Sequence, residues 1–321
     1  MPRKFIIDTD TASDDAVAII MALRWPDVEV AAITTVSGNV SLEQATTNAL
    51  YTVELCGADT PVYRGADRPL VREPAYAHWF HGKDGFGDMR YPQPKRGVEA
   101  KHAVDALIDT IQANPGIVLV TLGPLTNVAL AVARMPEIVA KVSRCVVMGG
   151  AACTVGNVTP AAEYNIWVDP EAARMAFHSG LPIEMVGWEH CRGESVFGGQ
   201  EIARLRDLGT PLAEFAVDSN RTAIAAFQTQ TGEAGLSLPD PVAMAIALDR
   251  SVCTRGSRHY VDIETTSELR RGMTVVDQLG VATDERNRAV WKPLIAREPN
   301  AMVCWEFDAR RFKEMVYEAL R

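Results

Sequence analysis

The segment Lys4-Phe5-Ile6-Ile7-Asp8-Thr9-Asp10-Thr11-Ala12-Ser13-Asp14-Asp15 holds the pattern on which the fold prediction depends. Its apolar start, residues 5–7, predicts a short buried strand, and four carboxylates follow within eight residues. The apolar run at residues 16–23 then predicts a helix. Strand, acidic loop and helix in this order place side chains at the carboxyl end of a parallel strand, where open α/β sheets keep their binding sites.

Four carboxylates this close together repel one another, so their placement needs an explanation. Folding them together is favourable if a cation lies among them or if some are protonated. Capping is a simpler alternative for Asp14 and Asp15, because acidic residues in a first helical turn suit the helix dipole. Capping does not explain Asp8 and Asp10, which end an apolar strand where water is scarce.

The whole chain has the composition of a globular protein. It has 321 residues, of which 47% are hydrophobic and 23% charged. Strand and helix patterns alternate along it without repeats or a clear linker. We therefore predict one α/β domain over residues 1–321, with an open, mostly parallel sheet and helices on both faces, a Rossmann-like arrangement.

Charge and cysteine usage exclude several classes of partner and compartment. The net charge of −9 argues against nucleic acid and anionic membranes, which attract basic surfaces. The six cysteines are far apart and form no CxxC pair, which favours free thiols over a disulfide framework or a zinc site. There is no signal-peptide pattern and no apolar run of membrane-spanning length. We expect a cytoplasmic protein.

Polar groups follow other predicted strands as well. A strand at residues 28–36 ends at Gly38-Asn39, and one at 116–122 leads through Gly123-Pro124-Leu125-Thr126-Asn127 into a helix. Strands are also predicted at 142–148, 183–186 and 301–307. A plain turn explains Asn39 equally well from its local sequence. A Pro-bounded Asp240 before an apolar helix fits simple capping too.

Two irregular segments stand out. Residues 64–100 contain His78-Trp79-Phe80-His81-Gly82-Lys83-Asp84-Gly85-Phe86-Gly87, and a long loop of this kind suits a lid over a small planar ligand. Its glycines do not form a GxGxxG motif after a strand, so we reject a dinucleotide site. Residues 157–170 carry several amide and carboxylate side chains without a helical or strand period, and turns are the competing explanation.

Together these motifs resemble the inosine–uridine nucleoside hydrolase family. The matching pieces keep the family's order over most of the chain: Asp8-Thr9-Asp10 through Asp14-Asp15-Ala16, Gly38-Asn39, residues 81–87, Gly123 to Asn127, Met148-Gly149-Gly150, residues 157–170, Asp240-Pro241 and residues 271–277. One DxD motif is weak evidence, whereas this ordered set is specific.

The resemblance implies hydrolysis of the N-glycosidic bond of ribonucleosides, with Ca²⁺ as cofactor. By similarity, Asp10, Asp15 and Asp240 bind the metal through carboxylates and Thr126 through its carbonyl oxygen. Asp10 activates the metal-bound water as general base. Asp14, Asn39 and Asn165 hold the 2′ and 3′ hydroxyls, and Asn157 and Glu163 hold the 5′ hydroxyl. The resemblance also implies a homodimer or homotetramer that acts in nucleoside catabolism or purine salvage.

The chain departs from the family pattern at one position. Many relatives have a His immediately before the Asp at position 240, where it helps to protonate the departing base, and this chain has Pro239. Proline has no proton to donate. We therefore assign leaving-group activation first to His81 and second to His190, with a proton from solvent as a further route. Phe227, Gln230 and Trp79 are candidates for contact with the base.

Two other functions remain open at this level. Asp8-Thr9-Asp10 after an apolar strand also fits a haloacid-dehalogenase-type phosphatase that uses Mg²⁺, although that motif usually has Thr or Val where Ala12 stands. Pro239 also fits a member of the hydrolase family that binds nucleosides and cleaves them weakly. The preferred base cannot be read from these patterns.

Overall fold

The computed structural model describes residues 2–287 and 298–321. It contains ten strands: β1 (Arg3–Thr9), β2 (Val28–Thr35), β3 (Val62–Arg64), β4 (Ile117–Thr121), β5 (Val142–Met148), β6 (Ile183–Val186), β7 (Cys253–His259), β8 (Val261–Ile263), β9 (Thr274–Val276) and β10 (Ala301–Phe307). Eight of them form one sheet in the order β3-β2-β1-β4-β5-β6-β10-β7, and β8 pairs with β9 in a separate antiparallel sheet.

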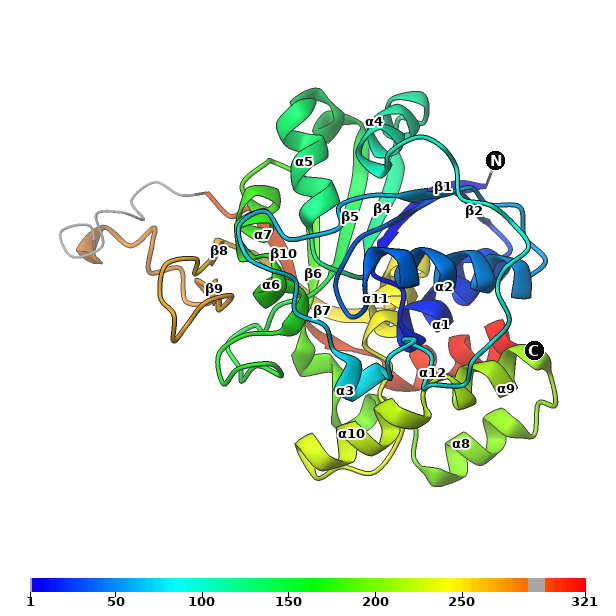
Figure 1. Ribbon diagram of the computed structural model, residues 1–321. Helices are drawn as coiled ribbons and strands as arrows, with labels where there is room; N and C mark the ends of the chain where they lie inside the picture. Colours follow the sequence, from blue (N-terminus) through cyan, green and yellow to red (C-terminus); the bar gives the residue numbers. More distant parts are fainter. Residues whose placement is uncertain (1, 288–297) are drawn as a thin grey trace.

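Helices cover both faces of the large sheet (Figure 1). They are α1 (Ser13–Arg24), α2 (Leu42–Leu55), α3 (His78–His81), α4 (Ala103–Ala113), α5 (Thr126–Arg134), α6 (Tyr164–Val168), α7 (Pro170–Phe177), α8 (Gly199–Arg206), α9 (Pro211–Asp218), α10 (Arg221–Thr231), α11 (Pro239–Leu248) and α12 (Ala309–Leu320). Five short 3₁₀ helices lie at Pro136–Lys141, Trp188–Cys191, Gly193–Ser195, Arg250–Val252 and Glu285–Asn287. None of the described helices is both long and apolar enough to cross a bilayer.

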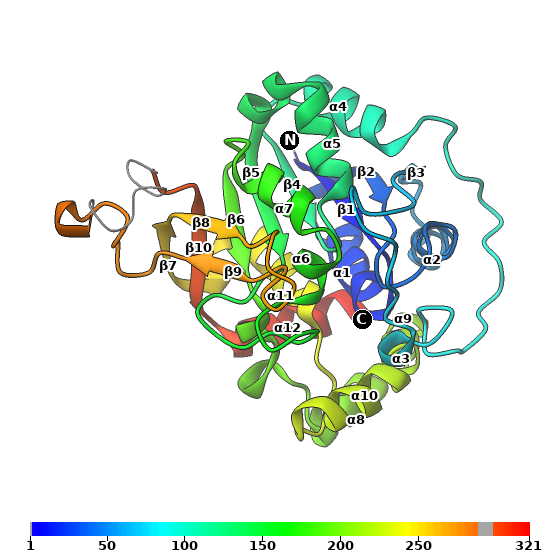
Figure 2. The same cartoon turned by 60° about the vertical axis from the view of Figure 1, so that its left-hand side comes forward.

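The side chains of β1 point alternately to the two faces of the sheet, which explains why the sheet has a hydrophobic core on each side. Phe5 and Ile7 belong to the larger cluster, with residues of α1, α9, α11 and α12. Ile6 belongs to the other cluster, with residues of α4, α5 and α7. Successive strand residues point to opposite faces, so an apolar run such as residues 5–7 is what a strand buried on both faces requires. Figure 2 shows the helices on the two sides of these strands.

The parallel sheet has its switch point between β1 and β4. The chain runs outward from β1 to β2 and β3, and then returns to place β4 on the other side of β1. All neighbouring strands are parallel except β7, which pairs antiparallel with β10. The first turns after β1 and β4 therefore lie side by side, and a crevice at this position is the usual binding site of such folds.

The predicted fold class is confirmed, and the differences in the elements have local causes. Strand β7 was not predicted because its sequence, Cys-Thr-Arg-Gly-Ser-Arg-His, is polar and mostly exposed at the sheet edge. The segments at 64–100 and 157–170 contain the short helices α3 and α6. Helices α8, α9 and α10 follow one another closely but are separate, because Pro211 and Asn220 begin new ones.

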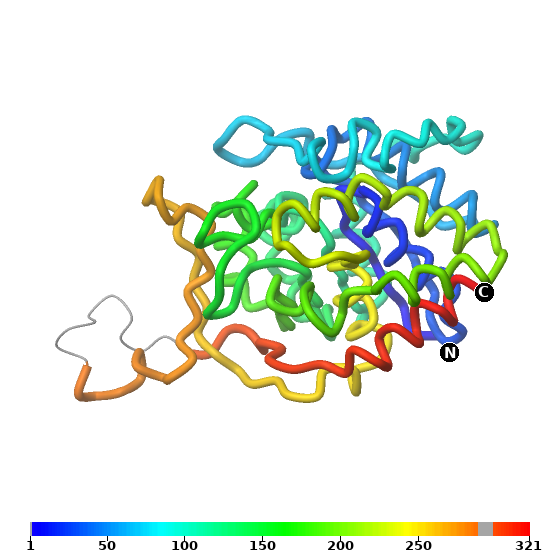
Figure 3. Tube along the Cα trace, turned by 90° about the horizontal axis from the view of Figure 1, so that it is seen from below, coloured from blue at the N-terminus to red at the C-terminus, as the bar shows by residue number. Residues whose placement is uncertain are grey.

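The chain after β8, residues 264–287, extends outward from the main body of the molecule, as Figures 1 and 3 show, whereas β8 itself packs in the core through Val261 and Ile263. Leu269 and Leu279 lie in this segment, and their side chains are 82% and 86% exposed.

Candidate active site

The acidic loop after β1 is held by its own hydrogen bonds. Thr9 donates from Oγ1 to Asp15 Oδ1 at 2.5 Å, and the Ala12 N–H donates to Asp15 Oδ2 at 2.8 Å. Asp15 thereby caps the start of α1 from inside the helix, since Ala12, the N-cap residue, has no side-chain group to do so. Asp10 comes from the short loop after β1, and Asp14 and Asp15 come from the first turn of α1.

Asp10 is fully buried between two glycine turns. Its Oδ2 accepts the Asn39 N–H at 2.5 Å, and its Oδ1 has no partner among the described residues. A Cβ on Gly38 would lie 2.0 Å from Asp10 Oδ2, and one on Gly123 would lie 2.8 Å from Oδ1. Both turns therefore need glycine so that their backbones can pack against the carboxylate.

Asp14, Asp15 and Asp240 form the centre of the site. One carboxylate oxygen from each lies within 4.8 Å of the others. Asp15 is fully buried, and burial together with the charge of Asp14 raises its pKa to about 7. Burial and the neighbouring Asp15 raise the pKa of Asp10 and of Asp240 well above the ordinary range. Such carboxyls ionise readily only when a cation neutralises them, and oxygen donors of this kind fit a hard divalent ion.

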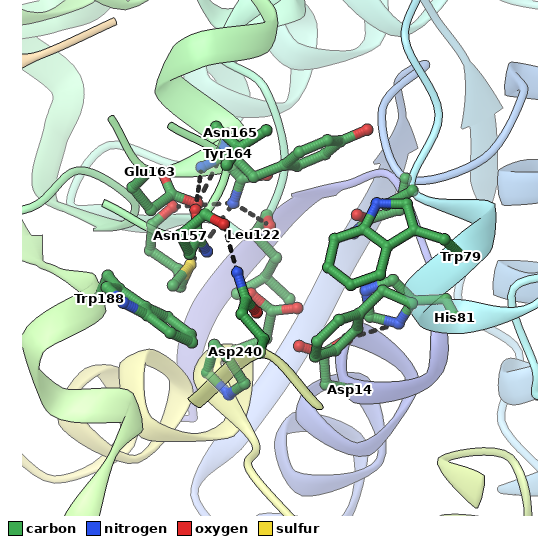
Figure 4. Close-up of a pocket in the computed structure, with 17 residues that line it drawn as sticks. Asp14, Trp79, His81, Leu122, Asn157, Glu163, Tyr164, Asn165, Trp188 and Asp240 are labelled. Carbon is green, nitrogen blue, oxygen red and sulfur yellow. Dashed lines mark hydrogen bonds and ion pairs between the residues drawn. The ribbon is translucent and has the colours of Figure 1, made fainter. Parts of the chain in front are cut away.

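A pocket opens beside this cluster (Figure 4). Nine of the candidate residues line it, and seven of these are Asp14, Asn39, Asn157, Glu163, Asn165, Gln230 and Asp240. His81, Trp79 and Pro239 line it as well. Residues from six regions of the chain thus meet in one pocket.

Glu163 lies on the side of the pocket opposite Trp79 and His81 (Figure 4). It caps α6 and accepts N–H groups of Asn165 at 2.8 Å, Ile166 at 3.2 Å and Gly150 at 2.9 Å. Burial raises its pKa to about 7. A carboxyl in this state can donate or accept a hydrogen bond near neutral pH, which suits contact with a hydroxyl.

Two amides are fixed by the backbone around them. Asn165 donates from Nδ2 to the carbonyl oxygens of Leu122 at 2.9 Å and Met148 at 3.2 Å, so its Oδ1 is left for other partners. Asn157 accepts the Tyr164 N–H at 2.8 Å. Gln230 donates to the Asn157 carbonyl oxygen, which ties the end of α10 to this side of the pocket.

His81 lies in the last turn of α3 and is 6% exposed. Its Nδ1 lies 3.1 Å from Ser13 Oγ and 3.7 Å from Asp14 Oδ1. Burial lowers the pKa of this imidazole, and the charge of Asp14 opposes the effect. Trp79, on the same helix, is 61% exposed at the rim of the pocket.

Five candidates do not line the pocket. Asp10 and Asp15 lie among the neighbouring buried carboxyls, and Thr126, Phe227 and His190 lie elsewhere. Thr126 is the first residue of α5, a position whose carbonyl oxygen accepts a backbone hydrogen bond within the helix. Its hydroxyl donates to Asp169 Oδ2 at 2.7 Å. Leu122, four residues earlier, lines the pocket instead. Phe227 is 1% exposed and packs in the core against Trp188. His190 is bonded through Nε2 to the Cys304 carbonyl oxygen at 2.8 Å.

Sequence reasoning also missed pocket residues. Tyr164, Trp188, Met148 and Leu122 line the pocket, but none was assigned a role. Tyr164 lies just after the irregular segment at 157–163, and Trp188 lies just after β6. This location was the one feature of the sequence that could have marked them as pocket residues. Their large apolar side chains read more simply as core, so only the fold separates them from core residues such as Phe227.

Comparison with known proteins defines the class. A solved plant nucleoside hydrolase has a TM-score of 0.91 and 32% identity, with 100% of this chain and 99% of that chain covered. The pyrimidine-specific ribonucleoside hydrolase RihA of Shewanella woodyi is 39% identical over 100% of this chain and 98% of its own length. The inosine-uridine preferring nucleoside hydrolase of Leishmania major is 40% identical over 86% of this chain and 88% of its own.

The family model for inosine-uridine preferring nucleoside hydrolases matches residues 5–314. The chain belongs to this family, as its sequence motifs indicated, and it is an enzyme of the nucleoside hydrolase class. A phosphatase of the haloacid dehalogenase type is therefore no longer an alternative.

Proposed function

We propose that this enzyme hydrolyses the N-glycosidic bond of a ribonucleoside in a Ca²⁺-dependent reaction that yields ribose and a free base. One observation carries the proposal: three buried Asp carboxyls share a small volume beside amide and carboxyl groups that suit ribose hydroxyls. The supporting relatives act on nucleosides by their names. They include pyrimidine-specific and inosine-uridine enzymes, so the preferred base is left to experiment.

The metal would be held by Asp10, Asp15 and Asp240, with Asp14 at its side. Leu122 replaces Thr126 as the source of a backbone oxygen in this proposal, because Leu122 lines the pocket. Ca²⁺ takes about six to eight oxygen ligands in flexible geometry, and this site offers oxygen donors from several turns. A bound Ca²⁺ supplies charge that neutralises the carboxylates, orients the ribose diol and polarises water.

The ribose would lie across the carboxylate cluster. Asp14, Asn39 and Asn165 bind the 2′ and 3′ hydroxyls, and Asn157 with Glu163 binds the 5′ hydroxyl. A 2′-deoxyribonucleoside would leave buried polar groups without partners. This costs about 1–3 kcal/mol for each group and favours ribonucleosides.

Bond cleavage places positive charge on the sugar while the electron pair of the C1′–N bond passes to the base. Water attacks C1′, and Asp10 takes its proton, because Oδ1 of Asp10 is buried and has no other partner among the described residues. His81 activates the leaving base by donating a hydrogen bond from the imidazole. Pro239 lines the pocket but has no hydrogen to donate.

Release of ribose tests the proposal. The substrates are inosine, adenosine, guanosine, uridine, cytidine and p-nitrophenyl riboside, each assayed with Ca²⁺, after chelation, and after Ca²⁺ or Mg²⁺ is restored. We expect cleavage of at least one natural nucleoside, loss on chelation and recovery with Ca²⁺. Nucleoside binding without cleavage of any substrate would instead support a member of the family that only binds nucleosides.

We also propose that the chain forms a homodimer or homotetramer. The projecting segment with the exposed Leu269 and Leu279 supports this proposal, because burial of these side chains against a second subunit removes apolar surface from water. Light scattering coupled to size-exclusion chromatography gives the mass directly. A monomer at micromolar concentration would refute it.

A further inference from the structure

Ser13 makes a contact that the proposed mechanism does not yet use. It is the first residue of α1 and is fully buried. Its Oγ lies 3.1 Å from Nδ1 of His81, which is 68 residues away in sequence. The contact joins the acidic loop to α3, so it links the carboxylate cluster to the side chain assigned to the leaving base.

The Ser13 hydroxyl does not have the usual function of a serine at a helix start. Such hydroxyls commonly accept a backbone N–H as N-caps. Here the N-cap residue is Ala12, and the Asp15 carboxylate accepts its N–H. The Ser13 backbone carbonyl accepts from Asn220 Nδ2 at 3.3 Å. Within the described part of the chain, His81 Nδ1 is the one hydrogen-bond partner of the hydroxyl.

The direction of this hydrogen bond follows from the burial of both groups. A buried hydroxyl hydrogen without an acceptor costs free energy, and Nδ1 is the acceptor within reach. If Nδ1 carried the proton instead, it would donate to Oγ, and the hydroxyl hydrogen would be left without a partner. Donation from Ser13 to Nδ1 therefore satisfies both groups, and the proton of the neutral imidazole then lies on Nε2.

Nε2 is the nitrogen that remains for the substrate. It has no partner in the described residues, and His81 lines the pocket. Asp14 competes for Nδ1, since its Oδ1 lies 3.7 Å away and lacks a hydrogen-bond partner among these residues. A carboxylate beside Nδ1 favours a proton there, which would leave a lone pair on Nε2. The Ser13 hydroxyl opposes that tautomer.

We propose that Ser13 is a positioning residue that holds His81 in the tautomer with its proton on Nε2, so that this nitrogen donates to the departing base. The inference rests on the proposed function, because it assigns the residue that prepares His81 for its role. It also gives a route to leaving-group activation in a chain that has Pro239 beside Asp240.

The kinetic test compares two substrates that differ in their need for the donor. A natural nucleoside needs help to release its base, whereas p-nitrophenolate leaves readily without a donor. We expect Ser13→Ala to lower kcat for the best natural nucleoside about tenfold, the effect of losing one hydrogen bond. The kcat for p-nitrophenyl riboside should stay within about twofold.

Three further variants make the test specific. Ser13→Cys keeps the packing but has a weaker hydrogen-bond donor. It should therefore also lower kcat for the natural nucleoside and leave kcat for p-nitrophenyl riboside nearly unchanged. His81→Ala should lose about 100-fold on the natural nucleoside, and addition of Ser13→Ala should cause little further loss. Ser37→Ala is the matched control, since Ser37 is also a buried serine, 2% exposed, but its hydroxyl has no hydrogen-bond partner among the described residues.

A second readout does not depend on activity. Nitrogen-15 NMR of histidine-labelled protein distinguishes the two neutral tautomers, and loss of one signal in His81→Ala assigns His81. We expect a protonated Nε2 and an unprotonated Nδ1 in wild type, with a shift toward the other tautomer in Ser13→Ala.

Two patterns would overturn the inference: equal loss on both substrates in Ser13→Ala, or a wild-type His81 with its proton on Nδ1. Failure of the wild type to cleave any substrate would instead refute the proposed function.

Discussion

Asp10 illustrates how one buried oxygen acquires a chemical role. One of its carboxylate oxygens accepts the Asn39 N–H, and the other has no partner in the described residues. Burial and the charges of Asp15 and Asp14 keep its pKa well above the ordinary range. These conditions favour a group that takes up a proton during a reaction, and a cation in the cluster would hold it ionised beforehand.

Asp10→Asn should therefore lower kcat about 1,000-fold, because an amide cannot take a proton from water. Asp8→Asn is a matched control, since Asp8 is fully buried in β1, two residues before Asp10, and its Oδ1 accepts from Thr34 at 2.5 Å and Asn127 at 2.8 Å. It should reduce stability and leave kcat within a few-fold of wild type. Steady-state kinetics on the best natural nucleoside measure both. Comparable losses of kcat in the two variants would contradict the role of Asp10.

Pro239 offers a gain-of-function test. It is the first residue of α11, where a backbone N–H needs no partner within the helix, so replacement costs little helix stability. Its side chain lines the pocket. Pro239→His should raise kcat for natural nucleosides about tenfold, because imidazole adds a donor near the base, and should not change p-nitrophenyl riboside hydrolysis. Pro239→Ala controls for loss of the ring, and an equal gain in that variant would exclude a donor effect.

At the scale of elements, Tyr164 joins three segments around the pocket. It is the first residue of α6, and its hydroxyl lies 2.8 Å from the Gly38 carbonyl oxygen and 2.6 Å from that of Ala75. The Ala77 N–H donates to the Asn39 carbonyl oxygen at 2.9 Å in the same region. The contacts of the Tyr164 hydroxyl join α6 to the turn after β2 and to the segment before α3. Helix α3 carries Trp79 and His81.

Tyr164→Phe should raise KM about fivefold, the equivalent of about 1 kcal/mol for one hydrogen bond, with a smaller change in kcat. The physical reason is that the Asn39 turn and α3 lose a shared anchor and must be ordered by the substrate. Hydrogen–deuterium exchange should increase at residues 75–82. Tyr76→Phe is the control, since Tyr76 is 39% exposed and stacks on His78. Unchanged exchange in Tyr164→Phe would show that the hydroxyl does not anchor these segments.

Element prediction succeeded where periodicity and turn chemistry agreed. Strands β5, β6 and β10 have the predicted bounds, because apolar runs between clear turn residues leave few alternatives. The prediction failed at β7, whose residues pair with β10 through backbone hydrogen bonds and carry no apolar pattern. It also failed at α3 and α6, since helices of four and five residues have almost no periodicity.

At the scale of the whole molecule, buried carboxyls set the dependence of stability on pH. Burial raises the pKa of Asp8, Glu163 and Glu189 to about 7. In the unfolded chain these groups ionise near pH 4, whereas the folded protein keeps them protonated up to about pH 7. The folded state therefore binds more protons between these values, and the free energy of unfolding falls as pH rises through this window.

We expect the metal-free protein to have a lower Tm at pH 7.5 than at pH 5.5. The difference should be at least about 2 °C, which corresponds to about 1 kcal/mol in a chain of this size. Thermal unfolding followed by circular dichroism in chelator measures it. Glu189→Gln, which removes one of these groups outside the proposed ribose site, should reduce the difference. A Tm that is equal or higher at pH 7.5 would contradict the raised pKa values.

The sequence by itself determined the α/β class and the acidic segment after β1, because both are encoded in short, local patterns. The proposed ribose-binding set came from the resemblance to the family and not from these patterns. Hydrophobic periodicity sets the elements, and glycine and acidic turns mark the carboxyl ends of strands. Asn39 and Asn157 lie in turns, Glu163 is the N-cap of α6, and Asp14, Asn165 and Asp240 lie in the first turns of α1, α6 and α11. The fold brings all six to one pocket.

Only the tertiary structure decided which neighbouring positions enter that pocket. It selected Leu122 over Thr126, placed Phe227 in the core, and brought Ser13 to His81 across 68 residues. The orientation of a side chain at the end of an element depends on strand twist, helix entry and packing against distant segments. None of these is contained in the local sequence. Which of two residues a few positions apart faces the pocket is therefore decided only when the chain is folded.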